Sequence, residues 1–578
     1  MPSSHIPRNR LTALFNWNGK KTNLIFQDDK FSSDIVNVSV ERIPVLKCGN
    51  RCLFRNAKTN TITAVVGYIS NLDQICIKYH IDKNDDVEII EKIYALNGIK
   101  FISELEGVFT ILIWDEAKQK GYVFQDEYGS NLPLYYASNC KELCISTSIR
   151  AILNRDLFSR KLNMSAVGDF FISKVIVPNK DTFIEGVFKL VPHHCIVIDG
   201  EMTSFQIKPV QYSKKKVSLH YAKANLIESL SNSIQVLHEQ LKSDRRICTL
   251  SAGLDSNAIL NYLSRLTKRI VAITIGGKKR NEIPNAVKLA EHYANVEHIT
   301  AIVNDNRLDY FPDIVWRTEG YVCEGGLFLQ YELANLLSTH GLTELMCGEG
   351  ANEILDPLRN QESYFYLKRE FKSYLRYIVL HENWPGRIRE SKLFQYIRKP
   401  TLKIHYDYEL DYTLKKNGIL MNSYGIQPVY PFVNRRIAEM SAALGELNKR
   451  VIKRGVMQER NFYRQQIQTV LGKSKMALII EAGGATDVEY LFEGYHETIS
   501  ALMEHSFFRP VIRKKRINRI RKDLKGHSEL VLRLLYLFVF NKLFISGEFD
   551  SKFQDMELKI NLKDILQDEL FKMNGQVK

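Results

Sequence analysis

Residues 245–263 read RRICTLSAGLDSNAILNYL, and this stretch decides the fold of the larger part of the chain. The apolar run Ile247–Leu250 predicts a strand, the small residues after it predict a tight turn, and the pattern from Leu254 predicts a helix. A small-residue turn between strand and helix lets backbone N–H groups approach phosphate closely, and the helix dipole adds to the attraction. The stretch therefore predicts a phosphate-binding loop, with an ordinary βα turn capped by Asp255 as the alternative.

The side chains of this turn suit a phosphate ligand. Ser251 and Ser256 can donate hydrogen bonds to phosphate oxygens, and Asp255 can hold Mg²⁺ against them. The candidate binding residues of the loop are consecutive: Ser251, Ala252, Gly253, Leu254, Asp255 and Ser256.

The sequence around the loop predicts a parallel α/β sheet. Apolar strands read ICTL (247–250), IVAITI (270–275) and ELMC (344–347), with helical stretches between them. Alternation of strand and helix is typical of parallel sheets. After about Pro357 the strands fade, and the stretches LNKRVIKRGVMQERNFYRQQI and SELVLRLLYLFVFNKLF predict helices. We therefore expect a helical C-terminal part.

The N-terminal third has a different pattern. From Thr12 to Val210 short β-rich runs alternate with turns: TAVVGYI, GVFTILIWD, KGYVFQD, LPLYYAS, LCISTS and CIVIDG. A chain of 578 residues is too long for one ordinary core. We place the domains at 1–212 and 218–578, because a run of lysines at 214–216 follows the last strand and a helical pattern starts at Leu219.

Composition narrows the function classes. Lys and Arg number 80 against 65 Asp and Glu, a net charge of +15 that suggests an anionic ligand or partner without naming it.

The longest tight apolar run, Leu534–Phe540, is far shorter than the roughly 20 residues of a spanning helix, and the N-terminus lacks an apolar signal region. Nine cysteines cannot all pair within one molecule, and Cys48 and Cys52 have no second Cys/His pair for zinc. We expect a cytoplasmic protein that does not associate with membranes.

Three motifs in order carry a family resemblance. The loop resembles the SGGLDS pyrophosphate loop of N-type ATP pyrophosphatases, with Ala252 in place of the second glycine. CGEGANEI (347–354) resembles the SGEGxDEL/F segment of the asparagine synthetase family, and Glu282 with Ala286 and Ala290 resembles its DE/SE…A segment. The β-rich runs LEGVFTILIWD, QDEYGSNLPLYYA and CISTSIRAIL resemble segments of that family's glutaminase domain.

The resemblance implies a fold and a set of site residues. The fold is an α+β N-terminal sandwich of the Ntn-hydrolase type, then an α/β parallel-sheet ATP-pyrophosphatase domain with a helical C-terminal part. The implied cofactors are ATP and Mg²⁺, with the loop residues, Glu282 and Gly348 binding the nucleotide. Asp255 and Asn352 match the metal positions, although the family usually has aspartate where Asn352 stands. Glu349 matches an acidic residue that accepts a proton from the amine, and Lys475 matches a lysine that stabilises charge on the adenylate and pyrophosphate.

Two departures from the family point to the substrate. Glutamine-hydrolysing members expose an N-terminal cysteine as nucleophile, whereas this chain has Pro2, and the glutamine-binding NGEIYN segment is absent. We therefore expect an inactive glutaminase-like domain. The segment YVCEGGLFLQYEL (321–333) differs from the aspartate-binding segment of true asparagine synthetases. The resemblance then favours family members that take the amine from the substrate, such as lasso-peptide macrolactam synthetases and β-lactam synthetases.

Our leading hypothesis is an AMP-forming amide synthetase that acts on a small-molecule or peptide carboxylate, with a precursor peptide and a maturation protein as expected partners. Ammonia-dependent asparagine synthesis is the second hypothesis. A tRNA-modifying enzyme with the same loop would not need the first domain, and Ala252 and Asn352 leave a non-catalytic scaffold open.

The basic segment Arg509–Lys525 predicts a solvated or interdomain helix, with docking of an acidic chain or RNA as alternatives. Nucleic acid is not an expected partner.

Overall fold

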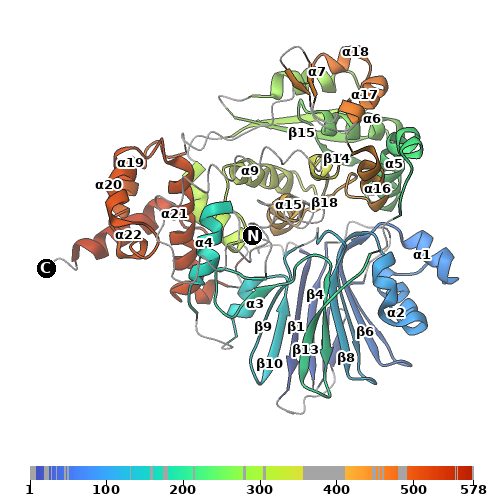
Figure 1. Cartoon of the computed structure of the whole chain (residues 1–578), viewed down its shortest axis with the longest axis horizontal. Coiled ribbons are helices and arrows are strands. Elements are labelled where there is room, and N and C mark those ends of the chain that lie inside the picture. The colour runs from blue at the N-terminus through green and yellow to red at the C-terminus, as the bar shows by residue number, and fades with distance from the viewer. Residues whose placement is uncertain are drawn as a thin grey trace.

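The computed structural model describes residues 8–575 except 18–24, 28, 34, 44–46, 48–50, 130–131, 156–159, 174–179, 213–214, 278–280, 304–306, 356–409, 446–450, 454–455, 459–460, 480–490, 554 and 556. Figure 1 shows two antiparallel sheets at the bottom, a parallel sheet with its helices above them, and a group of C-terminal helices on the left.

Two antiparallel sheets form the N-terminal part. The first has the order β11-β9-β10-β1-β4-β3-β2 and the second has the order β13-β12-β8-β7-β6-β5. The strands of the first sheet are β1 (Arg10–Asn16), β2 (Ile25–Gln27), β3 (Lys30–Ser32), β4 (Val36–Glu41), β9 (Tyr135–Ser138), β10 (Glu142–Ser146) and β11 (Phe188–Lys189). Those of the second are β5 (Leu53–Asn56), β6 (Thr61–Ile69), β7 (Gly107–Asp115), β8 (Lys120–Gln125), β12 (His194–Asp199) and β13 (Ser204–Pro209).

Alternation of side chains along these strands builds a four-layer sandwich. Leu11 and Phe15 of β1 pack between the sheets, whereas Leu14 faces helices α3 (Ile149–Leu153) and α4 (Met164–Ser173). Every residue of β6 is buried, because α1 (Leu72–Tyr79), α2 (Asp86–Asn97) and the 3₁₀ turn η1 (Gly98–Glu104) cover its other face. The predicted Ntn-type sandwich is confirmed.

The second sheet system is parallel throughout, with the order β16-β15-β14-β17-β18. Its strands are β14 (Arg246–Thr249), β15 (Ile270–Gly276), β16 (Val296–Ile302), β17 (Glu344–Met346) and β18 (Gln427–Val429). The chain runs outward from β14 in one direction through β15 and β16, and in the other through β17 and β18. The order therefore reverses between β14 and β17, and ligands of open α/β sheets bind at the carboxyl ends of strands at such a switch point.

Helices surround this sheet and continue beyond it. They are α5 (Leu219–Gln240), α6 (Leu254–Leu266), α7 (Ile283–Ala290), α8 (Phe311–Thr318) after the turn η2 (Arg307–Tyr310), α9 (Gly326–Thr339), α10 (Ala351–Leu355), α15 (Asp411–Ser423), α16 (Arg435–Leu444), α17 (Asn461–Leu471) and α18 (Lys473–Met476). The predicted α/β domain with helices on a parallel sheet is confirmed.

The predicted helical C-terminal part is confirmed, but part of one predicted helix after Pro357 is wrong. Strand β18 completes the parallel sheet there, and the first half of LNKRVIKRGVMQERNFYRQQI forms an antiparallel hairpin of β19 (Val451–Lys453) and β20 (Val456–Gln458) rather than a helix. The β-branched residues Val451, Ile452 and Val456 favour strands, and Gly455 in the sequence between them is a turn residue. Only the second half of the stretch is helical, as α17.

The C-terminal helices pack on both preceding parts. They are α19 (His496–Leu502), α20 (Lys514–Lys522), α21 (Ser528–Phe540) and α22 (Leu562–Gly575), with short turns η6 (Ser506–Phe508), η7 (Asn541–Ile545) and η8 (Asp550–Lys552). The apolar run of α21 is buried, with ring contacts from Phe170 to Tyr536 and from Phe183 to Phe540. This run is a core helix, and no helix among the described residues is long and apolar enough to cross a membrane.

The basic segment Arg509–Lys525 is helical only in its middle, as α20. Ile520 is buried against the C-terminal core, whereas Arg521 forms an ion pair with the exposed Glu504. The apolar side of the segment therefore holds it to the protein, and the role of its charges stays a prediction.

A buried lysine lies where the first sheet contacts the second part of the chain. Lys189 on β11 is 6% exposed, and its ammonium lies 4.8 Å from the ring centroid of Tyr321. Asp411 accepts hydrogen bonds from Tyr321 Oη at 2.6 Å and Lys415 Nζ at 2.5 Å. Burial lowers the pKa of Lys189 to about 8, and the charge of Lys415 lowers it further while Asp411 opposes the change.

This pKa predicts that the stability of the protein rises with pH relative to a Lys189→Met variant. Between pH 8 and 10.5 the unfolded chain binds the Lys189 proton and the folded protein does not, so folding becomes more favourable as the pH rises. Relative to methionine, the buried lysine should lower the free energy of unfolding by up to about 3 kcal/mol at pH 7. This difference should disappear by pH 10.5. Urea midpoints of the protein and the variant, compared from pH 7 to 10.5, measure this. Parallel profiles would contradict it, and Lys58→Met, at an exposed position, is the matched control.

Candidate functional site

The two predicted motifs meet at the switch point of the parallel sheet. Strands β14 and β17 are neighbours, with Cys248 paired to Met346, so the loops that follow them emerge side by side. A Cβ atom placed on Gly348 would lie 3.1 Å from Asp255 Cβ and 3.5 Å from Ser256 N. Gly348 thus lets the second loop approach the start of α6. The sequence motifs lie about a hundred residues apart, and the fold brings them into van der Waals contact.

The loop between β14 and α6 is held by its own side chains. Ser256 Oγ accepts a hydrogen bond from Ser251 N at 3.1 Å and lies 3.0 Å from Ser251 Oγ. Asn257 Nδ2 donates to Ser251 O at 2.9 Å and to Gly253 O at 2.7 Å. These bonds fix the turn before any ligand arrives, which lowers the cost of binding. Sequence reasoning missed Asn257, because it lies inside the helical pattern of α6.

The loop ends where α6 begins, so its backbone N–H groups lie at a helix N-terminus. Gly253 precedes the helix, and Leu254 and Asp255 form its first turn. Ala252 is fully buried, so its methyl group fits where the family has glycine. The local geometry is that of a phosphate-binding loop.

Glu282, at the start of α7, contacts the same loop. It precedes α7, and its Oε2 accepts a hydrogen bond from Ala252 N at 3.1 Å. Burial raises the pKa of Glu282, and the Ala252 N–H opposes that shift. The structure therefore places Glu282 at the loop, where its carboxylate occupies the backbone N–H of Ala252.

The donor set suits Mg²⁺ that arrives with a nucleotide. Asp255 supplies a carboxylate in the first turn of α6, and Asn352, half-buried in the first turn of α10, supplies an amide oxygen. Mg²⁺ prefers oxygen ligands and is commonly held by one or two carboxylates together with substrate phosphates. The described residues contain no preassembled group of three or more His, Cys, Asp or Glu side chains. The residues fit a metal held jointly by protein and phosphate.

Glu349 is half-buried and belongs to a group of charged side chains around Lys416. It hydrogen-bonds Cys347, and burial together with the Glu349 charge raises the pKa of that thiol well above its ordinary value. Burial acts to lower the pKa of Lys416, yet Glu324, Glu349 and Glu353 outweigh it, so that this pKa is raised. Lys416 therefore stays charged beside Glu349.

Lys416 and its neighbours on α15 hold the side chains of Glu324 and Glu353. Lys416 Nζ lies 2.6 Å from Glu324 Oε1, and Tyr412 Oη donates to the other oxygen of Glu324. Thr413 Oγ1 donates to Glu353 Oε1 at 3.1 Å. Glu324 belongs to the segment 321–333, whose sequence departs from that of asparagine synthetases. Sequence reasoning flagged that segment but missed Lys416 and Glu324 as a pair.

Lys475 lies beside α6 and not on the loop. Its Nζ is 3.9 Å from the ring centroid of Tyr293 and 3.5 Å from Asn261 Oδ1. Burial and the charge of Arg265 lower its pKa. Asn261 lies about 9 Å along the helix from Asp255 at the rise of an α-helix. Contact of Lys475 with phosphate stays a prediction, and it requires the side chain to swing toward the loop.

Pro2 lies outside the described residues, so the inactive glutaminase domain stays a prediction too.

Family models match both parts of the chain. The glutamine amidotransferase domain matches residues 27–211, and asparagine synthase matches residues 234–471. The second match contains both motifs of the switch point and Glu282. The first covers most of the four-layer sandwich.

Curated relatives share low identity with the chain. Amidase chry2 of Gibberella zeae is 23% identical over 307 residues, which are 48% of this chain and 44% of the relative. Asparagine synthetase (glutamine-hydrolyzing) 2 of Bacillus subtilis is 26% identical over 41% of this chain and 34% of the relative. Asparagine synthetase B (glutamine-hydrolyzing) of Escherichia coli is 21% identical over 72% and 69%. The chain matches less than half the length of the first two.

Proposed function

The chain belongs to the asparagine synthetase superfamily, and on that premise we propose that it is an ATP-dependent, AMP-forming ligase that couples a carboxylate to an amine. The observation that carries this proposal is the contact of the two loops at the switch point, where a Cβ on Gly348 would touch Asp255. That contact places a phosphate-binding turn beside Glu349 and Lys416. Residues for both steps of the reaction, adenylation of the carboxylate and aminolysis of the acyl-adenylate, then lie together at the switch point.

The proposed reaction has two steps that divide between the loops. A carboxylate oxygen attacks the α-phosphate of ATP and pyrophosphate leaves, with the α6 N-terminus, Ser251 and Ser256 binding the phosphates. When bound, Mg²⁺ neutralises phosphate charge. The amine then attacks the acyl carbonyl, AMP leaves with the bonding electrons, and Glu349 accepts the proton lost from the amine. Lys416 keeps its positive charge beside Glu349 throughout.

The substrate class we propose is a peptide that carries both reacting groups, as in macrolactam formation during natural-product maturation. The glutamine-binding NGEIYN segment of the family is absent from the sequence, which favours an amine source other than glutamine. The segment 321–333, whose sequence differs from the aspartate-binding segment of asparagine synthetases, contributes Glu324 to the group around Lys416. A precursor peptide and a maturation protein are the proposed partners. Ammonia-dependent asparagine synthesis is the second candidate. Relatives named asparagine synthetase favour asparagine as the product, although their names give glutamine as the nitrogen source.

Pyrophosphate release with defined substrates tests this proposal. We expect release and the loss of one water, measured by mass spectrometry, with synthetic peptides that carry a free N-terminus and an internal Asp or Glu. We expect neither with aspartate and ammonia. Release with aspartate and ammonia alone would instead establish the second candidate. An absence of ATP–pyrophosphate exchange with every carboxylate would contradict the ligase assignment as a whole.

A further inference from the structure

Helix α15 connects the N-terminal sandwich to the proposed reaction site. In Figure 1 it lies between the antiparallel sheets and the parallel sheet. Two neighbouring pairs of residues on this helix, each four positions apart, face different parts of the protein. Asp411 and Lys415 form one pair and face the sandwich. Tyr412 and Lys416 form the other pair and contact Glu324. One helix therefore carries both sets of contacts.

Two crossed hydrogen bonds hold the segment 321–324 against the start of α15. Tyr321 Oη donates to Asp411 Oδ2 at 2.6 Å, and in the opposite direction Tyr412 Oη donates to Glu324 Oε2. Each segment thus supplies one tyrosine and one carboxylate, and we call these four residues the clasp. Tyr321 is 6% exposed and Asp411 is 5% exposed. Their hydrogen bond is therefore shielded from water, which strengthens it.

The N-terminal sandwich contacts the clasp at two points. Lys189 of β11 places its ammonium 4.8 Å from the ring centroid of Tyr321. Gly129, between β8 and β9, has a φ of +61°. A Cβ atom placed on Gly129 would lie 3.2 Å from Asp411 Oδ1 and 3.4 Å from Lys415 Nζ. Since a side chain would fill this space, glycine lets the sandwich come close to α15.

The other end of the clasp lies among the charged side chains of the proposed reaction site. Glu324 Oε1 is 2.6 Å from Lys416 Nζ, and the charge of Glu349 also acts on Lys416. One position further along α15, Asn417 Nδ2 donates to Cys347 Sγ at 3.4 Å, and Cys347 directly precedes Gly348 and Glu349. A shift of the first turns of α15 would therefore move the side chains that surround the proposed proton acceptor.

We propose that the N-terminal sandwich supports amide formation independently of glutamine hydrolysis: through Gly129 and Lys189 it holds the clasp, and the clasp keeps α15 in place beside Glu349. Asp411 and Tyr321 are then positioning residues, because they act through α15 and not on the substrate. Packing fixes the charged side chains before the substrate binds, which lowers the cost of ordering them during the reaction. This inference rests on the proposed ligase activity and goes beyond it, since it gives the sandwich a part in the second step.

Gly129→Ala and Gly98→Ala form a matched pair that tests this role. Both glycines lie in the N-terminal sandwich with φ values of +61° and +59°, which alanine adopts only at a cost. A methyl group at Gly98 meets no atom within 4 Å, whereas one at Gly129 meets Asp411. We expect Gly129→Ala to slow amide formation about tenfold or more, with ATP–pyrophosphate exchange kept within about threefold. Gly98→Ala should leave both rates unchanged.

Tyr321→Phe tests the clasp itself, because it removes the hydroxyl that donates to Asp411 and keeps the ring. Tyr94→Phe is the control, since it removes a similar hydrogen bond, to Asp115 at 3.1 Å, within the sandwich. We expect Tyr321→Phe to slow amide formation more than ATP–pyrophosphate exchange, and Tyr94→Phe to change neither rate. A merely structural tyrosine would lower both rates together, in proportion to the loss of folded protein.

Hydrogen–deuterium exchange of the same proteins without substrate provides a readout that does not depend on activity. Loss of the clasp should raise backbone exchange at 321–326 and at 411–418 in Gly129→Ala and Tyr321→Phe, and not in the two controls. Unchanged exchange at both ranges, or amide formation as fast as in the controls, would overturn the proposed role of the sandwich.

Failure of the ligase proposal would give a different result. The unmodified protein would then show no ATP–pyrophosphate exchange with any carboxylate, while hydrogen–deuterium exchange would still report the contact between the sandwich and α15. That result would also overturn the part of this inference that concerns amide formation.

Discussion

Asp255→Ala is expected to lower ATP–pyrophosphate exchange by about 100-fold or more. Asp255 lies in the first turn of α6, and Gly348 of the second loop packs against it. It is the carboxylate that the loop itself offers to a metal bound with the phosphates, and Asn352 supplies no charge to replace it. Removing it leaves phosphate charge uncompensated in the transition state of adenylation.

The exchange assay needs a control for loss of an acidic residue. Asp73→Ala removes an exposed carboxylate in the first turn of α1, where it pairs with Lys83 at 2.7 Å. Figure 1 shows α1 beside the N-terminal sandwich and away from α6. We expect exchange within twofold of the unmodified protein for this control. Asp255→Asn removes the charge and keeps the side-chain shape. Its ATP–pyrophosphate exchange should fall nearly as much as that of Asp255→Ala. Exchange that survives both Asp255 variants would remove Asp255 from the metal site and favour another ligand set.

The strands and the loop could be predicted from local sequence, because each signal lies within a few residues. IVAITI became β15, CIVIDG became β12, and the small residues after ICTL became the turn before α6. The hairpin at 451–458 escaped prediction because its charged residues fit a helical pattern as well as a strand pattern. In this stretch, the preference of β-branched residues for strands and of glycine for turns outweighed the helical spacing of the charged residues.

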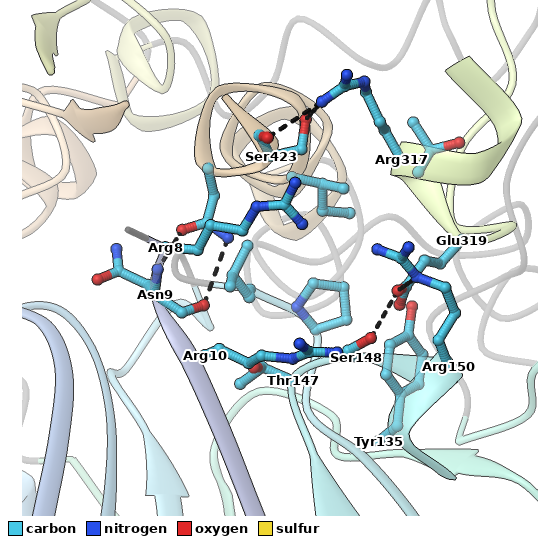
Figure 2. A pocket seen from close by; sticks show the side chains of 15 residues that line it. Arg8, Asn9, Arg10, Tyr135, Thr147, Ser148, Arg150, Arg317, Glu319 and Ser423 are labelled. Atoms are coloured by element: carbon cyan, nitrogen blue, oxygen red, sulfur yellow. Dashed lines mark hydrogen bonds and ion pairs between the residues drawn. The ribbon is translucent and has the colours of Figure 1, made fainter. Parts of the chain in front are cut away.

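The charged groups of the site could not be predicted in the same way. Lys416 and Glu324 are separated by 92 positions, and nothing local in either segment signals the 2.6 Å pair that folding creates. The cavity that Arg8, Arg10, Arg150 and Arg317 line is a stronger case, since Arg10 lies on β1 and Arg317 on α8 (Figure 2). Burial creates the interaction between such residues, so it becomes visible only when the elements are packed. Motif resemblance found Glu349 and Asp255 but gave no information on the side chains that surround them.

Glu349→Gln is expected to separate the two steps of the proposed reaction. The attacking carboxylate needs no base, so ATP–pyrophosphate exchange should stay within a few-fold of the unmodified protein. Attack by the amine releases a proton, and loss of a general base should slow amide formation by roughly 100-fold or more. Exchange and amide product, measured on the same preparation with the same peptide substrate, give the two rates. Equal losses in both would place Glu349 in nucleotide binding instead.

Glu353→Gln is the matched control, because this position shares the motif and the charged neighbourhood without the proposed role. Glu353 also supports the charge of Lys416, and it accepts a hydrogen bond from Thr413 at 3.1 Å. Both variants therefore remove one negative charge from the surroundings of Lys416. If loss of that charge alone slowed the second step, the two variants would behave alike. We expect only Glu349→Gln to lose amide formation, because a proton acceptor must lie beside the reacting amine, and a neighbour's charge cannot replace it.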